Sequence, residues 1–135
     1  MLKIFIKNRG HIKVKMSIGE VLDKYSILQI KYRKIANKQK LLNVETELKY
    51  LDKLIKHLFD SYIEDYIKLY EINLKLWDVE DYLRLCEKTK TFDDKFIQAA
   101  RSVYIFNDQR AKIKKEINEK SNSKFVEEKE HINYG

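Results

Sequence analysis

Residues 76–84 read Leu-Trp-Asp-Val-Glu-Asp-Tyr-Leu-Arg, and residues 101–118 read Arg-Ser-Val-Tyr-Ile-Phe-Asn-Asp-Gln-Arg-Ala-Lys-Ile-Lys-Lys-Glu-Ile-Asn. In both stretches apolar residues recur at intervals of three and four, which is the period of an amphipathic α-helix. Acids, arginines, asparagine and aromatics stand beside these apolar seams, where a purely structural helix needs only solvated charge. The two stretches therefore predict long helices that carry a candidate site.

The same period predicts helices over about 18–38, 44–58, 62–88 and 92–119. The run from Ser17 to Glu20 has the spacing of a capping box, and Asn43, Ser61 and Thr91 are candidate caps of the later helices. A three-residue link makes the last two helices an antiparallel hairpin. The second and third helices are separated by no Gly or Pro, so one continuous helix is an alternative. We expect a mainly α fold, an antiparallel bundle of three to four helices.

Two short segments flank the bundle. In residues 1–16 apolar residues alternate on both sides of a turn at Asn8-Arg9-Gly10, which predicts an N-terminal β-hairpin. Residues 121–135 form a polar C-terminal tail in which Phe125, Val126 and Tyr134 could dock. The hairpin, the bundle over 17–120 and the tail are expected to form one domain, because 135 residues suffice for one good core.

Composition narrows the class of protein. The chain is 44% apolar and 36% charged, with three Gly and no Pro, which favours helices over a disordered or loop-rich chain. A single cysteine, Cys86, excludes an internal disulfide framework, and no apolar run approaches the length of a membrane span. We therefore expect a protein of a reducing, cytoplasmic setting that does not enter the membrane.

Charge is distributed unevenly along the chain. Residues 1–58 hold 14 Lys and Arg against 5 Asp and Glu, a net charge of +9, whereas residues 59–135 carry −2. This asymmetry suits an anionic partner. Soluble lysine-rich helices explain it more simply than nucleic-acid binding, which we do not favour. Because Lys greatly outnumbers Arg, the few arginines mark positions that need a planar, five-donor group.

Helical spacing places the candidate ligand-binding residues on two helices. Arg110 falls on the apolar seam, where a guanidinium must be paired or must face a cavity. Its partner is either Glu80 or Asp81 of the antiparallel neighbour, or a ligand phosphate or carboxylate. A solvated, salt-bridged face is the simpler interpretation of each other residue taken alone. The candidate ligand-binding residues are Trp77, Glu80, Asp81, Arg84, Arg101, Tyr104, Asn107, Arg110 and Lys114.

Four carboxylates form a candidate metal site. If Glu20, Asp23, Glu80 and Asp81 converge, their oxygens suit Mg²⁺ or Mn²⁺. The spacing resembles the acidic pairs of all-helical nucleotide pyrophosphatases, although Glu80 and Asp81 are neighbours rather than one turn apart. Capping of the first helix is the simpler role for Glu20.

Other chemistries find no support in the chain. Cys86 falls on an apolar seam and is expected to be an inert core thiol. The three histidines have no partners at zinc-ligand spacing, and the three glycines are isolated, which argues against a phosphate-binding loop.

An ordered series of short motifs carries a resemblance to a known family. The motifs are Ser-Ile-Gly-Glu at 17–20, Leu-Trp-Asp-Val-Glu-Asp at 76–81, Arg-Ser-Val-Tyr at 101–104, Asn-Asp-Gln-Arg-Ala at 107–111 and Val-Glu-Glu-Lys at 126–129. Over roughly residues 16–134 the chain resembles domain-of-unknown-function family 6165, small bacterial and viral proteins. The resemblance implies a link to nucleotide-sugar or glycan biology, and it implies that the tail folds back over the bundle. It brings no activity and no catalytic residue.

Three functions remain at this point. The favoured one is binding of an anionic small molecule, a nucleotide, nucleotide-sugar or sugar phosphate, by a protein that could sequester it for a virus. The second is a Mg²⁺-dependent phosphohydrolase, and the third is a helical adaptor with no ligand. Whether the protein is an enzyme stays open, with binding favoured over catalysis. Exposed apolar stripes with neighbouring tyrosines predict a homo-oligomer, a dimer by default.

Overall fold

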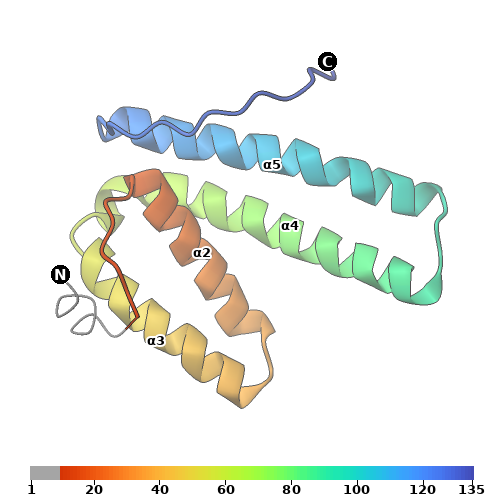
Figure 1. The fold of residues 1–135 in the computed structure, drawn as a ribbon, viewed down its shortest axis with the longest axis horizontal. Helices are drawn as coiled ribbons and strands as arrows, with labels where there is room; N and C mark the ends of the chain where they lie inside the picture. Colours follow the sequence, from red (N-terminus) through yellow and green to blue (C-terminus); the bar gives the residue numbers. More distant parts are fainter. Residues whose placement is uncertain (1–9) are drawn as a thin grey trace.

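The structure, a computed structural model, describes residues 10–135 (Figure 1). The described chain is mainly helical, as the periodicity predicts. Its helices are α2 (Ile18–Lys34), α3 (Lys38–Ile55), the short 3₁₀ helix η1 (Phe59–Tyr62), α4 (Ile63–Thr89) and α5 (Asp94–Lys120). Within these residues, no helix combines the length and the apolar composition needed to cross a membrane.

Polar caps fix where the helices begin. The hydroxyl of Ser17 accepts a hydrogen bond from the backbone N–H of Glu20 at 3.2 Å, which confirms the predicted cap of α2. Helix α3 starts six residues earlier than predicted, because the side chain of Asn37, not Asn43, accepts from the N–H of Lys40. The first turn of α3 is largely exposed, so apolar periodicity alone could not detect it.

The predicted second and third helices are separate. The 3₁₀ turn η1 lies between α3 and α4, and Tyr62, not Ser61, occupies the position before α4 without a side-chain cap. Helix α4 ends at Thr89 and is followed by its C-cap Lys90, whose backbone is left-handed with φ of 55°. Asp93, not Thr91, caps α5 by accepting from the N–H of Phe96. These turns fold α4 and α5 into the expected antiparallel hairpin.

Helix α2 lies between the α4/α5 hairpin and α3. Figure 1 shows α2 crossing the end of the hairpin where α5 finishes, while α3 packs back along α2. Two small cores result, and α2 contributes to both. One core contains Leu22, Tyr66, Leu69 and Ile117, and the other contains Leu28, Val44, Leu48 and Leu51. The apolar face of α2 therefore joins the two helical pairs.

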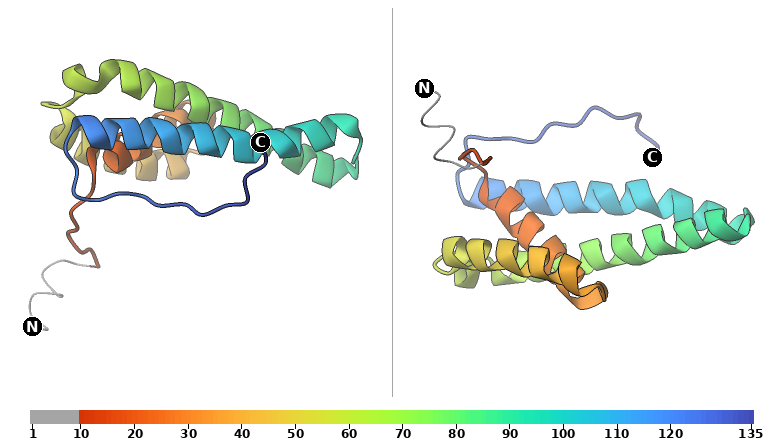
Figure 2. Two further views of the ribbon diagram at one scale, coloured as in Figure 1. Left: turned by 90° about the horizontal axis from the view of Figure 1, so that it is seen from above. Right: turned by 60° about the horizontal axis from the view of Figure 1, so that its bottom comes forward.

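The hairpin continues well beyond α2. We call residues 77–106 the distal hairpin, and the part where α2 packs on α4 and α5 the base. In the distal hairpin only Cys86 is buried, as expected for a core thiol. In both views of Figure 2 this end of the α4/α5 pair projects past α2 and α3. The distal hairpin thus has almost no core of its own.

The expected N-terminal β-hairpin is not found in the described residues. Its first half, residues 1–9, lies outside them, and residues 10–16 form no strand. Ile12 and Val14 are 72% and 67% exposed. A strand with one apolar face needs another layer to pack against. The exposed apolar side chains of residues 10–16 have no such layer in the described part of the chain.

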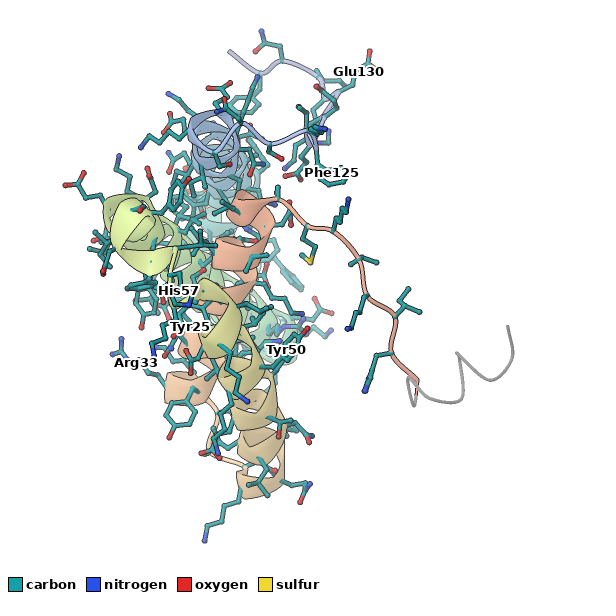
Figure 3. All side chains as sticks on the ribbon, turned by 90° about the vertical axis from the view of Figure 1, so that its left-hand side faces the viewer. Tyr25, Arg33, Tyr50, His57, Phe125 and Glu130 are labelled. Atoms are coloured by element: carbon teal, nitrogen blue, oxygen red, sulfur yellow. The ribbon has the colours of Figure 1, made fainter. Side chains whose placement is uncertain are left out.

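The C-terminal segment, residues 121–135, leaves the end of α5 and turns back along that helix (Figures 1 and 2). Figure 3 looks at the base and shows Phe125 and Glu130 on this segment, beside the end of α5. The segment has no regular secondary structure. Its position confirms that the tail folds back over the bundle.

Candidate functional site

The base is held together by a close crossing of α2 and α5. The backbone N–H of Gly19 donates to the side-chain oxygen of Asn118 at 2.9 Å. A Cβ atom at Gly19 would lie 2.6 Å from that oxygen and 2.7 Å from the backbone carbonyl of Lys114. Only glycine permits this approach, which sets the start of α2 against the last turns of α5.

The crossing brings a buried aspartate from α2 against the arginine on the α5 seam. Arg110 Nε donates to Asp23 Oδ1 at 2.9 Å, and Nη2 donates to Oδ2, so the pair is bidentate. Asp23 is only 4% exposed and Arg110 28%. The hydrogen bond that Arg110 donates to Asp23 raises the pKa of Arg110 above its usual value. Such a pair favours both charged forms in a partly dry site.

Two small polar residues complete the surroundings of Asp23. Asn73 Nδ2 donates to Asp23 Oδ1 at 2.9 Å and to Ser26 Oγ at 2.8 Å. The Ser26 hydroxyl in turn donates to the backbone carbonyl of Asp23 at 2.7 Å. No buried side-chain nitrogen or oxygen in residues 10–135 lacks a hydrogen-bond partner. The network therefore fixes α2, α4 and α5 to one another without a bound ligand.

Arg110 thus has a different protein partner from those that its position on the seam suggested. Glu80 and Asp81 of the antiparallel neighbour form no ion pair with Arg110, and α2, which packs on both α4 and α5, supplies Asp23 instead. The sequence correctly indicated that this guanidinium needs a partner. It could not indicate the partner, because the crossing of α2 is a tertiary feature with no local signal.

Lys114, one turn along from Arg110, is also paired. Its ammonium lies 2.7 Å from Glu20, 2.9 Å from Glu127 of the C-terminal segment and 4.0 Å from Asp23. Burial of Lys114 works against its charge, but the hydrogen bonds to Glu20 and Glu127 outweigh burial and raise the pKa. The carboxylate of Glu20 is therefore an ion-pair partner of Lys114, and Lys114 ties the C-terminal segment to the base.

A cavity opens where α2 leaves the hairpin. It has a volume of about 170 Å³ and lies among α2, α4 and α5. Four of the candidate ligand-binding residues line it together. Its lining residues are Ile27, Ile30, Asn73, Leu76, Trp77, Glu80, Asn107 and Arg110.

A larger cavity lies between α5 and the C-terminal segment. Its volume is about 510 Å³, and its lining includes Tyr134, whose hydroxyl donates to Asp108 at 2.9 Å. The rings of Tyr104 and Tyr134 meet edge to face, with centroids 5.1 Å apart. The lining residues are Val103, Tyr104, Asn107, Asp108, Lys129, His131, Ile132 and Tyr134.

A third cavity of about 150 Å³ adjoins the other two. Asn107 lines all three, Arg110 is shared with the cavity at α2, and Lys129 is shared with the larger cavity under the C-terminal segment. Lys129 also lines a further cavity of about 560 Å³ beside Lys112 and Lys115. Asn107 therefore stands at the centre of a run of connected spaces, which we call the α5 groove.

The α5 groove gathers most, but not all, of the candidate ligand-binding residues. Trp77, Glu80, Tyr104, Asn107, Arg110 and Lys114 line its three cavities. Asp81, Arg84 and Arg101 are exposed and line none of the three. The proposed metal ligands Glu20, Asp23, Glu80 and Asp81 do not assemble, since no group of three or more His, Cys, Asp or Glu suited to a metal ion occurs in residues 10–135.

Sequence reasoning missed four polar residues of the larger cavity. Asp108 lies on α5, one turn from Tyr104, but was not assigned to the site, and Lys129, His131 and Tyr134 belong to the tail. The signal available for the tail was its match to the family motif at 126–129 and the aromatic ring at Tyr134. Neither signal shows which helix the tail covers.

Comparison with protein families matches residues 12–134 of the chain to a family of unknown function, DUF6165. The chain belongs to this family. The DUF6165 match includes α2, all of the helical base and nearly the whole C-terminal segment, so the α5 groove lies within the family domain. No curated protein and no solved structure matches the chain.

Proposed function

We propose that this protein binds a small anionic molecule, a nucleotide, nucleotide-sugar or sugar phosphate, in the α5 groove. The observation that supports the proposal is the cavity of about 510 Å³ under the C-terminal segment, with two tyrosines, an amide, a carboxylate, a lysine and a histidine in its wall. Volumes of about 300–1,000 Å³ with a few convergent polar groups are typical of small-molecule sites.

Lys129 is the residue proposed to hold the anionic group. It forms no ion pair within residues 10–135, whereas Arg110 and Lys114 are already paired with acids. An unpaired ammonium at the junction of several cavities attracts a phosphate without breaking an existing ion pair. We therefore propose Lys129, rather than Arg110, for this role.

The remaining groups suit a ring and its hydroxyls. Tyr104 and Tyr134 offer aromatic faces for a base or a sugar, and the Asn107 amide both donates and accepts hydrogen bonds. Asp108 accepts from hydroxyl groups once the ligand displaces the Tyr134 hydroxyl. Arg110 and Lys114 hold the wall in place through the buried network. A ligand of this class fits a cytoplasmic protein, and binding without turnover would sequester it.

The test is thermal stability with nucleotides, nucleotide-sugars and sugar phosphates, each with and without Mg²⁺. A ligand at a hundred times its Kd stabilises the fold by about 2.7 kcal/mol, a rise of several degrees in Tm. We expect a selective rise that Lys129→Ala abolishes. The matched control is Lys124→Ala, an exposed lysine of the same segment outside these cavities.

Two results would overturn the proposal. One is a flat response across the panel, and the other is a ligand-induced rise of equal size in Lys129→Ala and the unaltered protein. Phosphate release that depends on Mg²⁺ would instead identify a hydrolase.

A further inference from the structure

The distal hairpin exposes apolar surface that the rest of the described chain leaves uncovered. Among residues 77–106 only Cys86 is buried, whereas the base buries leucines and isoleucines from four helices. Two helices in contact along a single line bury only part of each apolar stripe, and stable bundles of this kind usually contain four. The distal hairpin has only two helices along the whole of its length.

Helical spacing locates the uncovered surface. Arg110 and Asn107 both line the cavity at α2, so this side of α5 faces α2. Steps of four and three residues along the same side of α5, toward the tip of the distal hairpin, lead to Val103 and Ala100. On α4 the stripe that contains Asn73, Trp77 and Glu80 continues to Arg84. At the base, α2 packs over α4 and α5. These positions line the continuation of that same face along the distal hairpin, where no α2 covers it. Leu83, Phe96, Ala100 and Val103 are all partly exposed there.

The charge of this region distinguishes between possible partners. The distal hairpin holds 6 Asp and Glu and 5 Lys and Arg, a net charge of −1, although the whole chain carries +7. Its surface can therefore approach an identical surface without the repulsion that the basic N-terminal half would produce. A nucleic acid or an anionic membrane would favour the basic half instead.

Two charges at the edge of the groove are complementary to each other. Glu80 and Arg84 lie one turn apart, and neither forms an ion pair within residues 10–135. A two-fold axis between them, perpendicular to α4, would bring Glu80 of one copy opposite Arg84 of the other. The small side chain of Ala100 leaves room for close helix contact beside that axis.

We propose that the distal hairpin is the surface through which two copies of this chain form an antiparallel four-helix bundle. The distal hairpin of each copy covers Leu83, Phe96, Ala100 and Val103 of the other copy. Glu80 of each copy pairs with Arg84 of the other, so the ion pair forms twice, once on each side of the axis. The contact shares Val103 and Glu80 with the lining of the α5 groove, so the mass of the chain is measured without ligand, which separates this proposal from the proposed function.

The first test is the mass of the full chain in solution, measured by sedimentation velocity over a range of concentrations. We expect twice the 16.3 kDa mass of one chain, and the monomer mass for Ala100→Arg. The control is Gln98→Arg, which adds the same charge at an exposed position two residues away, on the opposite face of α5. Circular dichroism verifies that both variants keep their helices. A monomeric unaltered chain, or a dimer that survives Ala100→Arg, would overturn the proposal.

A charge exchange tests the pairing without touching apolar surface. Glu80→Arg and Arg84→Glu alone are each expected to weaken the dimer at least tenfold, because each places like charges in contact twice. The double variant restores the pairs and is expected to recover the dimer. If Ala100→Arg dissociates the dimer while both single reversals leave its Kd unchanged, the antiparallel pairing is wrong.

Discussion

The base and the distal hairpin are built from the same two helices, but they are stabilised in different ways. At the base, α2 covers α4 and α5 and adds a bidentate ion pair, a buried asparagine and a close glycine contact. In the distal hairpin no third helix of the described chain covers the apolar seam between α4 and α5, and Cys86 is the single buried residue there. Secondary structure of equal quality can therefore coexist with very unequal packing. The length and regularity of a helix therefore do not indicate how much that part of the chain resists local unfolding.

The largest expected effect breaks the polar network of the base. Arg110→Met leaves the carboxylate of Asp23 buried and without its guanidinium, so we expect a loss of about 3–5 kcal/mol in the free energy of unfolding. Arg101→Met, at an exposed arginine of the distal hairpin, is the control and should change stability by less than about 0.5 kcal/mol. Urea unfolding measures both, and equal effects would show that the ion pair does not stabilise the base.

The next effect concerns the crossing of α2 over α5. Gly19→Ala forces the helices apart, because the added carbon meets the Asn118 side chain and the Lys114 carbonyl, and we expect a loss of about 1–3 kcal/mol. Removing the Asn118 side chain as well should not restore stability, since the carbonyl stays in place. A fully stable Gly19→Ala variant in thermal unfolding would contradict the described crossing.

A smaller effect compares the two regions directly through their helix caps. Ser17→Ala removes the cap of α2 at the base, and Asp93→Ala removes the cap of α5 at the tip of the distal hairpin. Each cap is worth about 1 kcal/mol. We expect Ser17→Ala to lower global stability, and Asp93→Ala chiefly to speed amide hydrogen exchange in the distal hairpin. Identical exchange patterns in the two variants would show that the molecule opens as one unit.

The smallest expected effect is the pH dependence of the C-terminal segment. The hydrogen bond from Lys114 lowers the pKa of Glu127 below its ordinary value. The contact is therefore complete at neutral pH and is lost as the pH falls through the lowered pKa of the folded state. Limited proteolysis of residues 121–135 should accelerate in that acidic range. Glu127→Gln should be cleaved more readily already at neutral pH, and a variant cleaved like the unaltered chain would show that this contact does not hold the segment.

Local features of the fold could be predicted from the sequence, and tertiary features could not. The Ser17 cap, the two long helices and the buried Cys86 follow from spacing that involves a few neighbouring residues. The partner of Arg110 does not, because Asp23 lies 87 positions away and reaches it only through the crossing of α2. The start of α3 was missed because its first turn is exposed and has no apolar period.

The candidate site divides in the same way. Tyr104, Asn107, Arg110 and Lys114 share the flank of one helix, and periodicity was enough to group them. Lys129, His131 and Tyr134 enter the cavity from a segment without regular structure, and the side that such a segment covers has no periodic signal. Arg84 and Arg101 were grouped with these residues by residue type, but both are exposed and line none of the three cavities.

The contacts that join α2 to α5 span 99 and 87 positions of the chain. During synthesis Asp23 therefore leaves the ribosome well before Arg110 exists. At about 5–20 residues per second the delay is roughly 4–17 seconds. Over that time α2 and α3 have apolar faces and an acidic group whose partner is not yet made. We expect the base to form only after synthesis of α5 is complete, so the nascent chain depends on its lysine-rich first half for solubility until then.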